Sequence, residues 1–466
     1  MFRALKTLLF VAVLVSTWST AFAQSASDVV QKRTLPNGLD VIVIPSPGLP
    51  IATIEICVKN GAFTETPDLN GLSHLYEHMF FKGNAVIPNQ EAYLRRIRQL
   101  GIVFNGTTSS ERVNYYFTLP SDQLKDGLTF MRDAITTLKF DSVEFEKEKK
   151  VVLGEVDRNE SDPYYWFSQA VSAQLWYQYQ SRKDPLGDRA TIESATVAKM
   201  QTMKETYYVP NNSALVISGN VDANQVFTWA NDIFAGWKRA ADPFKANPVP
   251  AHPPLRESSY VVVERDVQVP FVEFSMHGPS VTQDPKATFA ADVLSYILSQ
   301  PTSKFHKNLV DSGLTLGAGL SYYTQKYTGP ISISAQVPPD KVPAAIQAIL
   351  MELPKMVEPD YFSDEQLTSA KTILAIEDLY SREKLSSFTH TISFWWATAG
   401  LDYYLNYIEN LRSVTRADIV RYVNTYLLNK PYILGVLVSP ATRTELGLTP
   451  ESLKIITAAA SSQQVK

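Results

Sequence analysis

The chain has few of the residues that mark several protein classes. Its only cysteine is Cys57, so an internal disulfide cannot form and the fold depends on packed cores. The net charge is −4, and no run of basic residues points to a nucleic-acid partner. Beyond the first 23 residues, no apolar run is long enough to cross a bilayer, which argues against a membrane-embedded protein. With 45% hydrophobic and 19% charged residues, the composition is typical of a soluble globular protein.

The first residues predict an export signal. Residues 1–23 have a basic start, an apolar run from Leu8 to Val15 and the small-residue exit Ala21-Phe22-Ala23. This pattern is typical of a secretory signal peptide that is cleaved after Ala23. The alternative is a retained signal anchor, although the apolar run is too short for a spanning helix. In a bacterium, the prediction is a periplasmic protein.

Histidine is also scarce, yet two of the six histidines share a short motif, His74-Leu75-Tyr76-Glu77-His78. On a helix, residues three and four apart are neighbours, so both imidazoles and Glu77 lie on one face. Two His nitrogens can hold one Zn²⁺, and a catalytic site takes three protein ligands and leaves a fourth position for water. The order H-x-x-E-H is the inverse of the H-E-x-x-H metallopeptidase helix, in which Glu is the general base. The alternative is an ordinary helix face with locally hydrogen-bonded His.

The third ligand of such a site need not be close in sequence. Asp141 to Asn159 predicts a helix, with acidic residues in the first turn and apolar residues at helical spacing. Glu148 and Glu155 lie seven residues apart on it, close to two turns, so both carboxylates project from the same side. From this pattern alone, Glu155 is either a surface acid or a metal ligand, and exposure is the commoner state of Glu.

Together these segments resemble the pitrilysin-type inverzincin zinc peptidases, which include insulysin and the mitochondrial processing peptidase. Gly71–Asn84 (G-L-S-H-L-Y-E-H-M-F-F-K-G-N) carries the H-x-x-E-H motif, and Glu148–Val156 (E-K-K-V-V-L-G-E-V) carries the distal acids. In that family the third ligand follows the second His by 77 positions, the distance from His78 to Glu155. The resemblance therefore implies Zn²⁺ on His74, His78 and Glu155. It also implies that Glu148 orders the site without binding the metal.

The activity that this resemblance implies is that of a zinc endopeptidase from the half-length, two-domain branch of the family. Zinc would lower the pKa of its bound water towards about 7, and Glu77 would accept the water's proton. A carboxylate beside a cation is expected to be ionised. Asn105-Gly106 resembles the family's edge strand, which takes an extended substrate by strand addition. The alternative for these two residues is a simple turn. Of Tyr115 and Tyr116, we expect one to face the cleft and one the core.

The chain divides into two similar halves. A proline-rich linker, residues 241–256, separates a metal-binding domain at 24–240 from a second domain at 257–466. The two domains echo each other, as in Ile54–Gly61 and Phe271–Gly278, which favours a duplication. Hairpins beside long helices predict an α+β fold, with helices packed on a largely antiparallel sheet in each domain. The first hairpin is expected around Asn37-Gly38, with a type I′ turn.

The second domain lacks the metal-binding residues. Counted from Gly61 and Gly278, the three residues of the motif fall opposite Ala291, Leu294 and Ser295. The second domain in this family also supplies an Arg and a Tyr that hold the substrate carbonyl and the developing oxyanion. The position that matches the Arg is Leu309 or Val310, and the position that matches the Tyr is Leu316, so both are apolar here. Tyr322 and Tyr323 lie nearby but off register.

The resemblance implies that a second two-domain subunit closes a chamber over the site. A homologous subunit that supplies the missing Arg and Tyr would make a heterodimer, and a homodimer is the alternative. The same missing residues favour a second hypothesis, a non-catalytic peptide-binding or assembly subunit that retains the zinc motif. A purely structural zinc site is disfavoured, because structural sites are closed by four ligands that usually include Cys.

Overall fold

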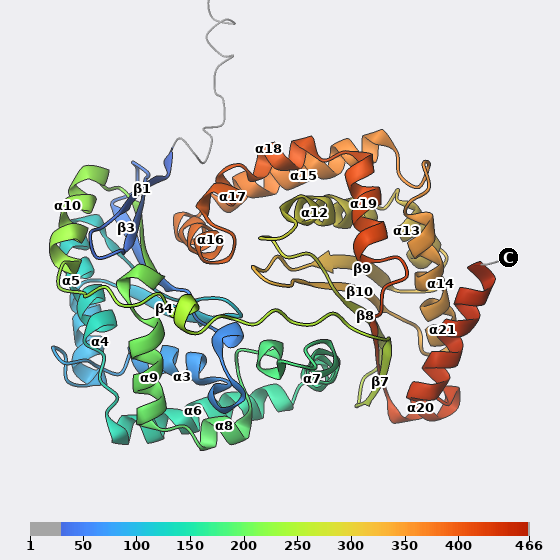
Figure 1. Cartoon of the computed structure of the whole chain (residues 1–466), viewed down its shortest axis with the longest axis horizontal. Helices are drawn as coiled ribbons and strands as arrows, with labels where there is room; N and C mark the ends of the chain where they lie inside the picture. Colours follow the sequence, from blue (N-terminus) through green and yellow to red (C-terminus); the bar gives the residue numbers. More distant parts are fainter. Residues whose placement is uncertain (1–28, 465–466) are drawn as a thin grey trace, which may run out of the picture.

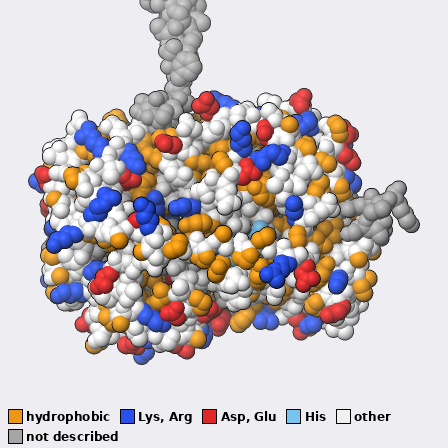
Figure 2. Space-filling model, viewed as in Figure 1, with side chains coloured by type: hydrophobic (Ala, Val, Ile, Leu, Met, Phe, Trp, Pro, Cys, Tyr) orange, Lys and Arg blue, Asp and Glu red, His pale blue; other side chains and the backbone are white. Residues whose placement is uncertain are grey.

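The computed structural model describes residues 29–464, so the predicted signal peptide at 1–23 lies outside the described residues. Two units lie side by side, each built of one sheet and several helices (Figure 1). Among the described residues, no helix combines the length and the apolar character that a membrane span needs. On the face shown in Figure 2, acidic and basic side chains are interspersed with apolar ones.

The first half of the chain forms a six-stranded sheet. Its strands are β1 (Gln31–Thr34), β2 (Asp40–Pro45), β3 (Ile51–Val58), β4 (Val103–Thr108), β5 (Val113–Pro120) and β6 (Ser213–Gly219). Its helices are α3 (Leu72–Phe80), α4 (Gln90–Gln99), α5 (Leu124–Thr136), α6 (Ser142–Glu160), α7 (Pro163–Leu175), α8 (Arg189–Glu193), α9 (Val197–Tyr207), α10 (Ala223–Phe234) and the short α11 (Pro243–Ala246).

The second half forms a five-stranded sheet. Its strands are β7 (Ser259–Glu264), β8 (Phe271–His277), β9 (Gly317–Tyr322), β10 (Pro330–Gln336) and β11 (Ile433–Val438). Its helices are α12 (Pro285–Ser299), α13 (Lys304–His306), η6 (Lys307–Asp311), α14 (Val342–Lys355), α15 (Asp364–Ser381), α16 (Leu385–Thr398), α17 (Leu401–Leu405), α18 (Tyr407–Ser413), α19 (Arg416–Tyr426), α20 (Pro440–Leu446) and α21 (Pro450–Gln464).

The strand orders of the two sheets correspond. The first is β1-β2-β6-β3-β5-β4 and the second is β7-β11-β8-β10-β9, so they match strand for strand once β1 is set aside. In both sheets one pair is parallel, β2 with β6 and β7 with β11, and the remaining pairs are antiparallel. The prediction of an α+β fold made of two similar, largely antiparallel sheets with packed helices is confirmed.

The first hairpin forms where we expected it, but its turn is of another type. β1 pairs with β2 from Thr34 and Asp40 outwards. Gly38 has a φ of 91°, whereas Asn429 is the only non-glycine with a positive φ in the described part of the chain. A type I′ turn needs positive φ at both central residues, so that expectation is wrong. Pro36 precedes Asn37 and favours a turn in which Gly38 donates its N–H to Leu35, 2.8 Å away.

One helix from each half of the chain packs against the sheet of the other half (Figure 1). From the second half, α16 lies between the two units and packs Phe388, Ile392 and Trp396 against the face of the first sheet that is opposite its larger core. From the first half, α7 packs against β11, and a Cβ at Gly435 would lie 2.5 Å from a methyl of Val171. Sequence order therefore does not separate the two units in space. The boundaries at residues 241–256 stay a prediction.

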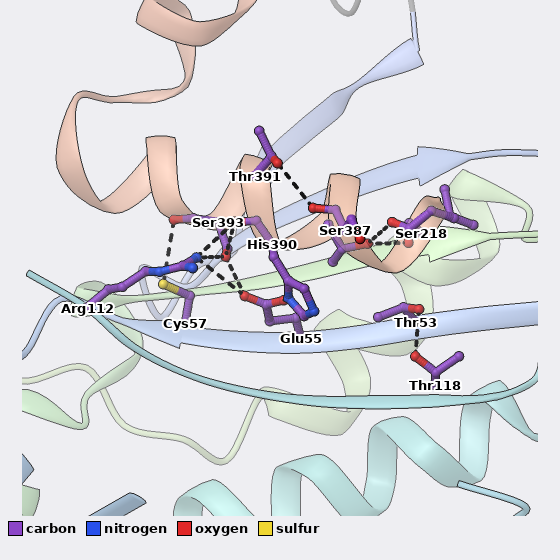
Figure 3. A network of polar contacts seen from close by, with 12 residues as sticks. Thr53, Glu55, Cys57, Arg112, Thr118, Ser218, Ser387, His390, Thr391 and Ser393 are labelled. Carbon is purple, nitrogen blue, oxygen red and sulfur yellow. Dashed lines mark hydrogen bonds and ion pairs between the residues drawn. The ribbon is translucent and has the colours of Figure 1, made fainter. Parts of the chain in front are cut away.

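A buried polar network fixes α16 on the first sheet (Figure 3). The carboxylate of Glu55, on β3, is fully buried and is bonded by His390 Nδ1 and by the hydroxyl of Ser393. Arg112 lies 3.8 Å from Glu55 Oε1 and donates to the carbonyl of His390 at 2.8 Å. Breaking a buried, paired charge costs about 3–5 kcal/mol, so this network specifies where α16 docks.

Candidate metal centre

The helix that carries the motif begins at a tightly packed loop. A Cβ at Gly71, whose φ is 88°, would lie 2.6 Å from the carbonyl oxygen of Leu186. The carboxylate of Glu65 then accepts the first free N–H groups of α3, from Gly71 at 2.8 Å and from Ser73 at 2.7 Å. Burial raises the pKa of Glu65 to about 7, and these bonds oppose the rise. With one face of α3 buried, the face with both His and Glu77 is left partly open.

Three donor atoms converge from α3 and α6. His74 Nε2 lies 3.2 Å from His78 Nε2, and Glu155 Oε2 lies 3.5 Å and 3.7 Å from these two nitrogens. Two ligands at about 2.0–2.1 Å from a tetrahedral zinc would lie about 3.3 Å apart. The observed triangle therefore fits one Zn²⁺. It is the only group of this kind that the described residues contain.

Glu148 holds His78 from the other side of the ring. Its Oε1 accepts a hydrogen bond from His78 Nδ1 at 2.8 Å, and its Oε2 pairs with Lys82 Nζ at 2.7 Å. Burial opposes ionisation of Glu148, but the hydrogen bonds from His78 and Lys82 outweigh it and lower its pKa. A carboxylate on Nδ1 fixes the tautomer whose Nε2 lone pair is free for a metal. Glu148 therefore orders a ligand and lies outside the ligand triangle.

His74 has no such support. Its Nδ1 is buried and has no hydrogen-bond partner among the described residues. Burial lowers the pKa of His74 to about 4, and the positive charge that His78 can carry contributes. Neutral imidazole is the form that binds metals, so His74 is ready as a ligand at neutral pH.

Glu77 lies between the ligands and the sheet edge. Its Oε2 accepts the hydroxyl of Thr108, on β4, at 2.7 Å. A Cβ at Gly106 would lie 2.7 Å from Glu77 Cγ, so the glycine leaves room for this side chain. Burial raises the pKa of Glu77 in the metal-free chain, and the bond from Thr108 opposes this. A cation bound at the ligand triangle would favour the ionised form of Glu77 that we expect.

The segment Asn105-Gly106 lies in a strand and not in a turn. β4 is the last strand of the first sheet and pairs with β5 on one side only. Asn105 is exposed, its Oδ1 accepts the N–H of Gly106 at 3.0 Å, and Gly106 faces Glu77. An exposed edge of this kind can accept an extended peptide. Substrate binding by these two residues stays a prediction.

The tyrosines of β5 point to opposite faces of the sheet. Tyr115 is buried in the core, and its hydroxyl lies 3.1 Å from that of Tyr208. Tyr116 is partly exposed on the other face and packs on His390 of α16, with ring centroids 4.4 Å apart. The core-facing ring is therefore Tyr115, and a cleft-facing role of Tyr116 stays a prediction.

The second half presents an apolar counterpart to the metal centre. Ala291 and Leu294 are fully buried on α12, which follows β8 as α3 follows β3. Leu309 is fully buried and Leu316 is 59% exposed. The hydroxyl of Tyr322 donates to the carbonyl of Pro279 at 2.9 Å. Tyr323 packs against Phe394.

Three residues of the site escaped the sequence analysis: Glu65, Lys82 and Thr108. Lys82 could have been found, because it stands only four residues after His78, just beyond the end of α3, and an acid-rich helix follows in the sequence. Thr108 and Glu65 gave no signal, because their partners lie 31 and 6–8 residues away in other elements.

Comparison with known proteins agrees with this geometry. The model described as Insulinase (Peptidase family M16) matches residues 40–188, and Peptidase M16 inactive domain matches residues 194–374. The chain is 22% identical to the zinc protease PqqE of Helicobacter pylori, over 89% of this chain and 94% of that protein. It is 24% identical to a zinc protease of Rickettsia felis, over 78% of this chain and 87% of that protein.

Solved structures share the fold. A protease from Helicobacter pylori superposes with a TM-score of 0.79 at 21% identity, covering 88% of this chain and 99% of its own. The periplasmic protease PqqL from Escherichia coli superposes with a TM-score of 0.75 at 16% identity, covering 94% of this chain and 51% of its own. Two family models that follow one another from residue 40 to residue 374, on a fold shared with these proteases, show that the chain belongs to peptidase family M16, the insulinase family.

Proposed function

We propose that this protein is an exported zinc endopeptidase that acts as the catalytic subunit of a heterodimer. The observation that carries the proposal is the convergence of His74, His78 and Glu155 beside Glu77, at spacings that suit tetrahedral zinc. The edge strand β4 borders this site and offers unpaired backbone to an extended peptide. Peptides and unfolded segments are therefore the proposed substrates.

Different residues of the chain have different roles in the proposed hydrolysis. Zinc, when bound, would acidify a water and polarise the scissile carbonyl. Glu77 accepts the water's proton on its carboxylate and passes it to the leaving amine, while Thr108 holds the carboxylate in place. Glu148 keeps His78 in the tautomer that leaves Nε2 free. Asn105 and Gly106 lie where an added substrate strand would run.

Export is supported by the pattern of residues 1–23, and one protein that shares the fold, PqqL from Escherichia coli, is a periplasmic protease. The mature chain would then act in the periplasm. An oxidising compartment suits a chain whose only thiol, that of Cys57, is buried. Mass spectrometry of the exported protein tests this step, with a mature N-terminus at Gln24 as the expected result.

The test of catalysis is Glu77→Gln, which removes the proton acceptor and keeps the shape. We expect bound zinc and the melting temperature to stay as they are, while turnover of an unstructured peptide falls by several orders of magnitude. Glu91→Gln on the exposed face of α4 is the matched control, since its side chain is 82% exposed. Near-normal turnover in Glu77→Gln would remove Glu77 from the base role.

The heterodimer is proposed because the second domain has apolar residues where the carbonyl and oxyanion donors are expected. Removing one oxyanion donor costs about 10²–10³ in turnover, so a chain that lacks both should be nearly inactive alone. We expect activity when it is mixed with a homologous exported subunit that carries the Arg and Tyr but lacks H-x-x-E-H. Full activity as a homodimer would refute this and return attention to Tyr322 and Tyr323.

The same apolar residues, Leu309 and Leu316, also favour a second candidate, a peptide-binding or assembly subunit without activity of its own. The two candidates differ in one measurement. Peptide cleavage by the mixed subunits that a chelator abolishes, and that Glu77→Gln in this chain abolishes, supports the catalytic role. Cleavage that survives Glu77→Gln would assign catalysis to the partner.

A further inference from the structure

A cavity lies close to the start of α3, the helix of the metal motif, and is bounded by segments from four parts of the chain. It has a volume of about 330 Å³ and lies between the loop before α3, the turn η4 (Gln180–Lys183), helix α9 and the linker around Pro250. Its walls are largely aromatic or apolar, with Phe63, Tyr179 and Tyr207 among them. Small-molecule sites span about 300–1,000 Å³, so the cavity has the size of a site for a small ligand.

One basic side chain lines this cavity, and no ion pair joins it to an acid among the described residues. Arg182 is 4% exposed, and its guanidinium is stacked between the rings of Phe63 and Tyr179, with centroids 4.9 Å and 4.7 Å away. Its Nη2 donates to the carbonyl of Pro250, and its Nη1 is buried with no hydrogen-bond partner among the described residues. A buried Arg is normally paired, because an uncompensated charge in the interior is costly.

The acids near this guanidinium are engaged elsewhere. Glu65 lines the same cavity, but both of its carboxylate oxygens accept N–H groups at the start of α3. Both oxygens of Glu111 accept the backbone N–H of Lys326 at 2.9 Å. Burial lowers the pKa of His277 to about 4, and the positive charge of Arg182 contributes to this depression.

We propose that this cavity binds a small ligand that carries a carboxylate and an apolar body, such as an N-acylated amino acid or the C-terminal residue of a peptide. Arg182 is its receptor for the carboxylate, because the planar guanidinium offers paired N–H donors that match carboxylate geometry. The aromatic walls receive the apolar body. The site is separate from the metal centre and does not depend on the proposed peptidase activity.

The cavity lies next to the residues that hold the start of α3. Glu65 lines the cavity and accepts the N–H groups of Gly71 and Ser73, next to His74. Ser181, one residue before Arg182, donates its hydroxyl to the backbone carbonyl of Glu65 at 2.8 Å. A ligand on Arg182 therefore contacts the segments that hold the start of α3.

The test is isothermal titration of the zinc-loaded mature chain with N-acetyl-L-phenylalanine and with its uncharged amide. We expect the acid to bind at least about 10-fold more tightly than the amide. Arg182→Met should weaken binding of the acid by about 10- to 100-fold, the usual effect of losing a hydrogen bond to a charged group. Arg182→Lys, which keeps the charge but loses the fork, should lie between the two. Arg96→Met on α4 is the control for loss of an arginine.

The outcomes separate the explanations. Equal binding of acid and amide, or unchanged binding of the acid to Arg182→Met, would overturn the proposal. The second outcome would also place the acid elsewhere, for example on the zinc. Inorganic phosphate that binds as tightly as the acid would overturn the carboxylate class. If Arg182→Met does not fold, two results still test the proposal. They are the difference in affinity between acid and amide on the unaltered chain and the weaker binding of the acid to Arg182→Lys.

Discussion

Zinc affinity should distinguish the two acids of α6. Glu155 Oε2 lies within 3.7 Å of both Nε2 atoms, whereas Glu148 bonds His78 on the opposite nitrogen. Glu155→Gln therefore removes a charged ligand, and Glu148→Gln removes only the support of one. We expect both proteins to fold and to differ in how tightly they hold the metal.

The magnitudes follow from the two positions. Binding free energies of about 10–16 kcal/mol, shared among four ligands, give roughly 2.5–4 kcal/mol for one ligand, so Glu155→Gln should weaken zinc binding by about 60- to 700-fold. Loss of a supporting carboxylate typically costs about 10- to 100-fold, or about 1.4–2.7 kcal/mol. Glu148→Gln also leaves the ammonium of Lys82 without its ionic partner.

The assay is a competitive zinc titration against a chelator, with thermal unfolding of the zinc-free proteins measured alongside. Glu146→Gln is the matched control, because this acid lies on the same helix with its side chain 63% exposed. Equal zinc loss in Glu148→Gln and Glu155→Gln, with similar stability of the zinc-free proteins, would refute the assignment of Glu155 as the third ligand.

Three further predictions follow from contacts between elements. Thr108→Val should lower kcat by about 10- to 100-fold with zinc content and KM unchanged, because Glu77 loses the bond that orients it; equal kinetics to wild type in steady-state assays would contradict this. Burial raises the pKa of Glu111 to about 7 from 4.5, so the folded state binds the proton more tightly and stability falls as pH rises through this window. Between pH 5 and pH 8, the free energy of unfolding of the unaltered chain, measured with denaturant, should therefore fall relative to that of Glu111→Gln by about 3 kcal/mol at most. A difference between the two proteins that does not change with pH would disprove this. A chain cut between Ala246 and Asn247 should elute as one species in gel filtration, since α7 and α16 each pack on the other half's sheet; separation without denaturant would show that this exchange is weak.

Local spacing carried the prediction of the elements. The H-x-x-E-H motif lies on a helix, α3, and the helix predicted from Asp141 to Asn159 forms as α6, from Ser142 to Glu160. Asp141, placed before an acid-rich turn, caps α6 by accepting the N–H of Val143 at 2.9 Å. These features depend on residues within a few positions of each other, which a sequence displays directly. The turn at Asn37-Gly38 differs from the predicted type because Pro36 precedes it and favours a turn in which only Gly38 has a positive φ.

The ligand set was only partly readable from residue chemistry. His74 and His78 are four residues apart on one helix, so their proximity follows from helix geometry. Glu155 lies 77 positions after His78, and no periodicity connects the two. It was singled out by the family's spacing, and the structure then places its carboxylate 3.5 Å from His74 Nε2.

The amino-acid sequence by itself determined which residues share a helix face or a strand, and with them the His pair, its neighbouring Glu77 and the duplicated order of elements. Only the tertiary structure decided which distant element covers each face: α16 over the first sheet, Thr108 against Glu77, and Arg182 in a cavity where no described acid forms an ion pair with it. The physical reason is that periodicity reports the direction of side chains within one element. The partner on that side is chosen by packing and charge pairing across the whole chain.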